Sequence, residues 1–113
     1  MSIFRDILNV LRQQEVGPLV PVKEGLNQYG LAVGSVVVSL AVPPGAVYAH
    51  LYVRTASVVF TTDRSAPTAT RGLQADATDI IVLDSSAKLR GFRVIQQSAA
   101  ATLDVEYFYR PRG

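Results

Sequence analysis

The segment that most constrains the fold is the last one, residues 102–110. Large apolar side chains alternate there with polar ones, a period of two that is typical of a β-strand with one buried face. Phe108 is the only large apolar residue on the polar side, which indicates either a half-covered edge aromatic or an anchor in a protein interface. The predicted buried face consists of Leu103, Val105, Tyr107 and Tyr109.

The same period of two recurs along most of the chain after Leu19. Pro43, Pro44 and Gly45 predict a type II turn between two of these segments, and residues 63–72 predict an irregular surface loop. Short strands separated by turn signals favour a mainly β fold, either an antiparallel β-sandwich or a jelly-roll-like barrel. Strands are predicted at residues 35–42, 47–54, 57–62, 79–83, 89–94 and 102–110, the fifth with a β-bulge at Gly91.

Two of the predicted strands have unusual faces. Residues 79–83 are apolar on both faces, as expected for a strand between two layers. Residues 47–54 have an apolar face and a second face of aromatic and polar side chains. We interpret Tyr48, His50 and Tyr52 on that second face, together with Phe108, as a candidate protein interface.

Residues 1–18 follow a helical rather than a strand period. Ser2 is a suitable N-cap, and Gly17 with Pro18 ends the predicted helix. This single short amphipathic N-terminal helix either packs on its own domain or serves as an arm, and we predict an arm that a partner chain or a capsid subunit completes. Its apolar stripe consists of Ile3, Phe4, Ile7, Leu8 and Leu11.

Length and composition limit the remaining possibilities. A chain of 113 residues is long enough for one core, so residues 19–113 are predicted to form a single β-domain. The absence of cysteine excludes disulfide scaffolds and cysteine-ligated zinc. The formal net charge of +2 gives no case for nucleic acid, and we expect neither a signal peptide nor a membrane span. We therefore expect a soluble protein made in a cytoplasm.

Catalytic chemistry is not indicated by the sequence. His50 is the only histidine, and no nucleophile elbow accompanies it. Asp104 and Glu106 share a strand face that reads as an ordinary solvated surface. The sequence therefore predicts no enzyme, cofactor or metal. Two weaker alternatives are a calcium site at Asp76, Asp79 and Asp84, which we interpret as turn-capping acids, and a polyanion surface at Arg64, Arg71, Arg90 and Arg93, which we expect to form salt links.

Residues 58–109 resemble a class of small structural proteins from tailed bacteriophages. The chain departs from the pattern at Arg64, where similar sequences commonly have a glycine. The matching features are Val58-Val59-Phe60-Thr61-Thr62-Asp63 with Ala66-Pro67-Thr68-Ala69 and Gly72, then Ile80-Ile81-Val82-Leu83, Gly91-Phe92-Arg93-Val94-Ile95 and Ala101-Thr102-Leu103-Asp104-Val105-Glu106-Tyr107-Phe108-Tyr109.

The resemblance implies a β-sandwich component of the virion, of the decoration or cement type that binds the capsid exterior after synthesis in the host cytoplasm. It implies the major capsid protein as partner, and a homo-oligomer for which a trimer is favoured and a dimer stays open. It brings no catalytic motif. The alternative is a tail, fibre or baseplate module that binds a host receptor or glycan through the face of Tyr48, His50 and Tyr52.

Overall fold

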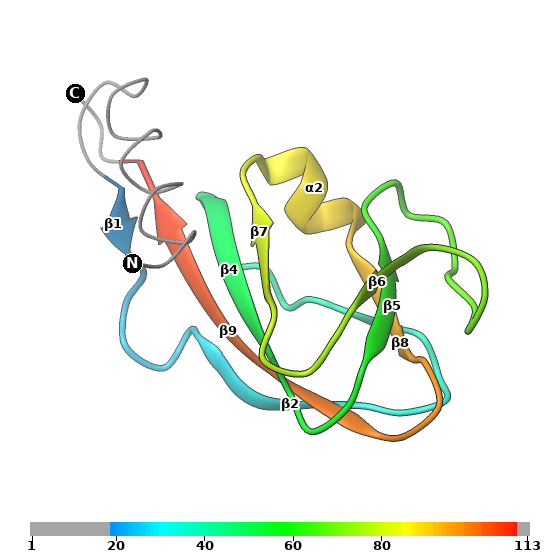
Figure 1. Cartoon of the computed structure of the whole chain (residues 1–113). Coiled ribbons are helices and arrows are strands. Elements are labelled where there is room, and N and C mark those ends of the chain that lie inside the picture. The colour runs from blue at the N-terminus through cyan, green and yellow to red at the C-terminus, as the bar shows by residue number, and fades with distance from the viewer. Residues whose placement is uncertain (1–18, 111–113) are drawn as a thin grey trace.

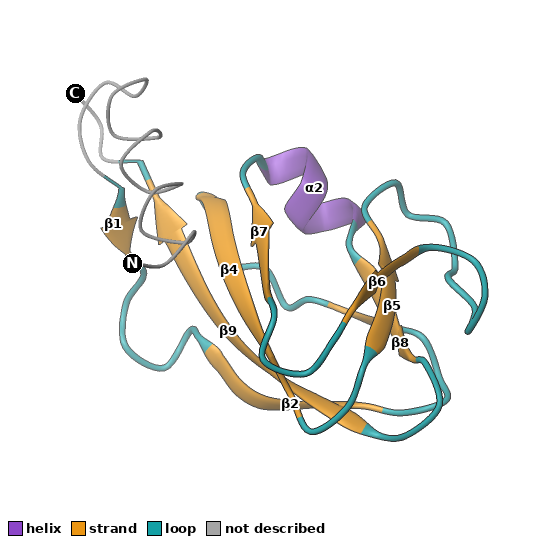
Figure 2. Ribbon diagram, in the orientation of Figure 1, coloured by secondary structure: helices purple, strands orange, loops and turns teal. Residues whose placement is uncertain are grey.

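The computed structural model describes residues 19–110, which form a mainly β fold with two antiparallel sheets (Figure 1, Figure 2). The larger sheet has the strand order β1-β9-β4-β7, and β2 also pairs with β9; the smaller sheet has the order β3-β8-β5-β6. The elements are β1 (Val20–Pro21), β2 (Gln28–Val33), β3 (Val38–Ser39), β4 (Ala46–Arg54), β5 (Val58–Thr61), β6 (Leu73–Ala75), β7 (Ile80–Leu83), α2 (Ser86–Gly91), β8 (Arg93–Gln96) and β9 (Ala101–Tyr109). The predicted N-terminal helix lies outside the described residues.

The long strands β4 and β9 form the centre of the larger sheet and pair directly, with Leu51 opposite Val105 and His50 opposite Glu106. Because side chains of directly paired residues point to the same side of a sheet, this register sorts both strands into a core face and an outer face. On β9 the core-face side chains are buried and the alternate ones are half-buried, as the alternation predicts. Tyr109, the last residue of β9, is the exception, since it is exposed although it pairs with Ala46 and Val20.

One hydrophobic core joins the two sheets. Leu51, Val105 and Tyr107 of the larger sheet and Val58 and Val94 of the smaller one are all buried in it. The chain also passes repeatedly from one sheet to the other: between β2 and β3, β3 and β4, β4 and β5, β6 and β7, β7 and β8, and β8 and β9. The helix α2 lies on the passage from β7 to β8 (Figure 1).

The prediction of a strand over residues 89–94 with a bulge at Gly91 is wrong in its first half. Ser85 caps a helical turn there, since its hydroxyl accepts a hydrogen bond from the Lys88 amide at 3.2 Å. The spacing of three between Leu89 and Phe92 is a helical spacing, and both side chains are buried. Only the part from Arg93 onward is a strand.

Two further strand predictions need correction. Residues 79–83 do not lie between two layers: on one face of β7 Ile81 and Leu83 are buried, whereas Ile80 on the opposite face is exposed. Of the strand predicted over 35–42, the structure has only β3, and Val36 is exposed. The fold depends here on pairing partners, which local periodicity does not specify.

Two turn predictions are confirmed. The Ala46 amide donates to the Pro43 carbonyl oxygen at 3.1 Å and Gly45 has φ +82°, as a type II turn requires. Residues 63–72 form an irregular loop. Arg64 occupies the left-handed region at φ 71°, the conformation for which glycine is suited, so the turn is kept at a conformational cost.

Candidate interaction surface

The outer face of the larger sheet brings together the four aromatic and polar residues that the sequence predicted as an interface. Tyr48 pairs with Phe108, His50 with Glu106, and Tyr52 with Asp104 across β4 and β9. We use the term outer face for the side of this sheet opposite the core. Its members on β4, β7 and β9 are Tyr48, His50, Tyr52, Arg54, Ile80, Val82, Thr102, Asp104, Glu106 and Phe108.

One end of the outer face is aromatic. The rings of Tyr48 and Phe108 meet edge-on with centroids 5.6 Å apart, and the His50 ring lies 5.2 Å from the Phe108 ring. Tyr48 is only 2% exposed although it lies on the outer face, so little of its ring is open to a partner. Burial raises the pKa of Tyr48 to about 12, because the phenolate would be poorly solvated there.

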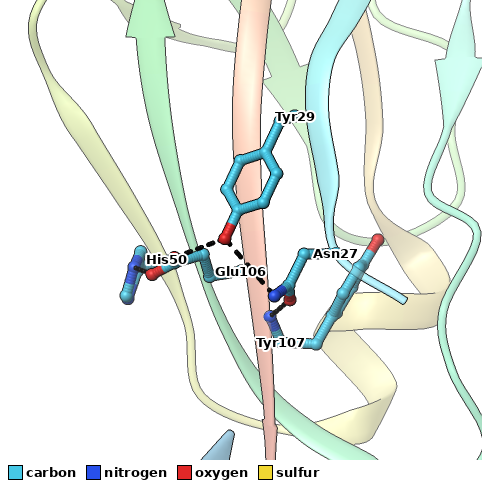
Figure 3. Close-up of polar contacts among 5 residues, drawn as sticks. All are labelled: Asn27, Tyr29, His50, Glu106 and Tyr107. Atoms are coloured by element: carbon cyan, nitrogen blue, oxygen red, sulfur yellow. Dashed lines mark hydrogen bonds and ion pairs between the residues drawn. The ribbon is translucent and has the colours of Figure 1, made fainter. Parts of the chain in front are cut away.

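The centre of the outer face is organised by Glu106 (Figure 3). Its Oε2 accepts a hydrogen bond from the Tyr29 hydroxyl at 2.7 Å, and its Oε1 lies 2.7 Å from His50 Nε2. Asn27 Nδ2 donates to the Tyr29 hydroxyl at 3.4 Å, and Asn27 Oδ1 accepts from the Tyr107 amide at 2.9 Å. The cluster therefore ties the segment that leads into β2 to both central strands. It corrects the interpretation of Glu106 as an ordinary solvated residue.

The other end of the outer face is a charged pair over an aromatic ring. Asp104 Oδ2 accepts from Arg54 Nε, and Asp104 Oδ1 accepts from the Gly30 amide at 2.8 Å. Gly30 has φ +73° at the irregularity in the pairing of β2 with β9. The Arg54 guanidinium lies 5.0 Å from the centroid of Tyr52, a cation–π contact. Asp104 thus fixes both the edge of β2 and the position of Arg54.

Both outer-face carboxylates have lowered pKa values. For Asp104 the main cause is the hydrogen bond from Arg54, followed by the Gly30 amide. For Glu106 the main cause is the hydrogen bond from Tyr29, which outweighs partial burial, and His50 lowers the pKa further. A carboxylate with a lowered pKa in the folded state contributes stability above its unfolded pKa and loses it as the pH falls through the folded value.

We therefore predict that Asp104→Asn makes the free energy of unfolding less dependent on pH in the acidic range. At about pH 7 the variant should lose ~1 kcal/mol of unfolding free energy, a small value because the pair is partly solvated. Between about pH 5 and pH 2 the wild type should lose more stability than the variant does. Urea denaturation at a series of pH values measures this. The control is Glu24→Gln, an exposed carboxylate, which should keep the wild-type slope; an equal slope for Asp104→Asn would contradict the assignment.

The other residues considered from the sequence are not part of this surface. The predicted stripe Ile3, Phe4, Ile7, Leu8 and Leu11 lies outside residues 19–110. Asp79 accepts from the Asp76 amide and so caps a turn as interpreted. Asp76 instead accepts from the side chains of Ser57 and Gln74, and Asp84 forms an ion pair with Lys88. Within the described range no group of three or more His, Cys, Asp or Glu side chains is placed to hold a metal ion.

The expectation that the four arginines form salt links is not met among the residues described. Arg93 Nη1 instead donates to the backbone carbonyl oxygens of Arg90 and Phe92. The ion pairs that the structure shows there are Arg54 with Asp104, Lys88 with Asp84, and His50 with Glu106 when the histidine is protonated. Arg64, Arg71 and Arg90 are exposed, and Arg93 is half-buried.

Sequence reasoning missed Asn27 and Tyr29. No sequence signal paired the segment around them with residues 101–105, and without that pairing Tyr29 could not be placed next to Glu106.

Comparisons of the chain with models of known protein families, with curated proteins and with solved structures found no match. Across residues 19–110 the structure offers no candidate membrane-spanning helix.

Proposed function

We propose that this chain is a non-enzymatic structural protein of a bacteriophage virion, a decoration or cement protein that binds the capsid exterior. The observation that carries the proposal is the outer face, where β4 and β9 gather the aromatic residues predicted as an interface beside paired charges. Exposed aromatic and aliphatic side chains surrounded by polar groups are typical of protein interfaces. The resemblance of residues 58–109 to phage structural proteins supplies the virion as the setting.

We further propose that the two sheets form a β-sandwich. The shared core and the repeated passage of the chain between the sheets support this arrangement. A β-sandwich suits a cement protein because a rigid core can present a broad sheet face to a neighbouring subunit. The proposed partners are the major capsid protein and further copies of this chain, in a trimer rather than a dimer by the resemblance.

The part of the outer face that is open to a partner lies around Tyr29, Tyr52 and Ile80. Tyr29, which bonds to Glu106, is 62% exposed and Ile80 is 43% exposed, while Tyr52 is half-buried between its partners Asp104 and Ile80. Ile80 pairs with Tyr52, so the two side chains occupy the same side of the sheet. This half of the outer face is the proposed capsid contact.

We predict that Ile80→Asp weakens capsid binding by about tenfold or more, the effect of ~1.4 kcal/mol at an interface anchor. Co-sedimentation of the purified protein with heads that lack it measures the affinity. The matched control is Leu73→Asp, which places the same charge on an exposed aliphatic site of the smaller sheet. The control should bind as the wild type does. Equal binding by both variants would place the contact elsewhere.

A second candidate function is glycan or receptor recognition by a tail or fibre module. The observation that favours it is the exposed Tyr29 ring beside the polar groups of Asn27 and Glu106, since sugars stack on aromatic rings that have hydrogen-bonding neighbours. The burial of Tyr48 reduces the aromatic surface available for stacking. Binding of the isolated protein to a glycan array, together with failure to bind heads, would favour this function over the capsid role.

A further inference from the structure

The aromatic end of the outer face is built to be covered. Tyr48 lies on the side of the sheet away from the core, yet it is almost fully buried. Its hydroxyl finds no hydrogen-bond partner among the described residues, so the whole side chain behaves as apolar surface. The Phe108 ring meets it edge-on, and burial this deep on the side away from the core requires a further apolar group across the Tyr48 ring.

The described chain starts next to this end. Leu19 leads directly into β1, which pairs with the last residues of β9: Pro21 is opposite Phe108 and Val20 opposite Tyr109. The Val22 amide continues the contact by donating to the Tyr107 carbonyl oxygen at 3.2 Å. Figure 1 shows β1 beside the end of β9, with β4 on the other side of β9. Whatever precedes Leu19 therefore begins at the edge of the row that contains Phe108 and Tyr48.

The length of the preceding chain suits an occupant from the same molecule. A helix over residues 2–16 would be ~22 Å long, and residues 17 and 18 between it and Leu19 can span up to ~7 Å when extended. Neighbouring strands are ~4.8 Å apart, so Tyr48 on β4 lies only two strand spacings from β1. The segment is therefore long enough to reach the aromatic end, and its predicted stripe of Ile3, Phe4, Ile7, Leu8 and Leu11 supplies an apolar face that can account for the burial of Tyr48.

We propose that residues 2–12 dock on the outer face of their own domain, with the stripe against Tyr48 and Phe108. This replaces the arm to a partner chain that the sequence predicted. It divides the outer face into an end that the chain covers itself and an end around Tyr29, Tyr52 and Ile80 that stays open. The inference does not depend on the proposed function, because it concerns one molecule alone.

Paramagnetic relaxation in the full chain tests this docking. The chain has no cysteine, so Arg5→Cys on the polar side of the predicted helix can carry a single nitroxide label. The amide signals of Tyr48, His50 and Phe108 should then relax several-fold faster than those of Val59 and Ile95 in the smaller sheet. Equal broadening in both sheets, or none in either, would overturn the proposal.

A mixed sample separates the same chain from a second copy. Protein that is enriched in ¹⁵N but carries no nitroxide is mixed with spin-labelled protein of natural isotope abundance. The amide signals should then show no broadening, because the nitroxide and the observed amides are on different molecules. Broadening of Tyr48 and Phe108 in that mixture would overturn same-chain docking and support the arm.

Paired substitutions test the stripe in the labelled chain. Phe4→Asp with Leu8→Asp should abolish the broadening, whereas Asn9→Asp with Gln13→Asp, which adds the same charge on the polar side, should retain it. Loss in both variants would show that charge, and not the stripe, holds the segment, and would overturn the proposal. If the first variant fails to fold, the broadening pattern of the labelled chain without these substitutions still decides whether the segment docks on its own domain.

Discussion

Replacing Phe92 by alanine should remove about 3–5 kcal/mol from the free energy of unfolding. The Phe92 side chain is fully buried where α2 leads into β8, and its ring stacks on Phe60 with centroids 5.5 Å apart. Truncation removes these contacts and leaves a cavity that the surrounding core closes only in part. Because domains of this size are stable by only ~5–15 kcal/mol, the denaturation midpoint in urea should fall by a large fraction.

The control for this prediction is Leu73→Ala. Leu73 is 60% exposed on β6, so its truncation should change the unfolding free energy by no more than ~0.5 kcal/mol. If Phe92→Ala were as mild as Leu73→Ala, the placement of α2 over the core would be wrong.

Gly91→Ala should destabilise the protein by ~1–3 kcal/mol, although alanine is the better helix former. A methyl group at this position would lie 2.3 Å from the Thr62 carbonyl oxygen and 3.0 Å from its carbon. Those atoms are backbone, and the Gly91 carbonyl oxygen also accepts from the Arg64 amide at 2.9 Å, so the loop is held where the methyl group must go. The clash exceeds the ~1 kcal/mol that helix propensity would return. Thermal unfolding measures the net effect.

Gly34→Ala is the matched control. A methyl group there would meet only the Gln96 side-chain oxygen, at 4.0 Å, which is an ordinary contact. We expect this variant to be neutral or slightly more stable, because alanine restricts the unfolded chain. A Gly91→Ala protein as stable as Gly34→Ala would show that the end of α2 does not pack against the loop after β5.

The sequence predicted those parts of the fold in which local pattern and tertiary environment agree. The alternation in residues 102–110 identified β9 because one face of that strand is buried over nearly its whole length. The same logic failed at residues 89–94. A helical turn, and not a strand, places Leu89 and Phe92 in the core. Ser85, whose side chain accepts from the Lys88 amide, was the N-cap signal for this turn.

The candidate surface was only partly predictable. Alternation placed Tyr48, His50, Tyr52 and Phe108 on polar faces of their strands, and the pairing of β4 with β9 is what joined them. Tyr29 and Asn27 could not be found, since their position depends on the pairing of β2 with β9 and on a positive φ at Gly30. The burial of Tyr48 also depends on what surrounds the sheet rather than on the strand itself.

The copy number of this chain in purified particles tests the proposed cement role most directly. Quantitative mass spectrometry of virions, with the major capsid protein as internal reference, gives the ratio of the two chains. A decoration protein that clamps neighbouring capsid subunits should be present in a fixed ratio to the capsid protein, with a copy number close to that of the capsid protein. Emptied heads should retain it. A chain that is absent from heads, or present at only a few copies per particle, would contradict the account.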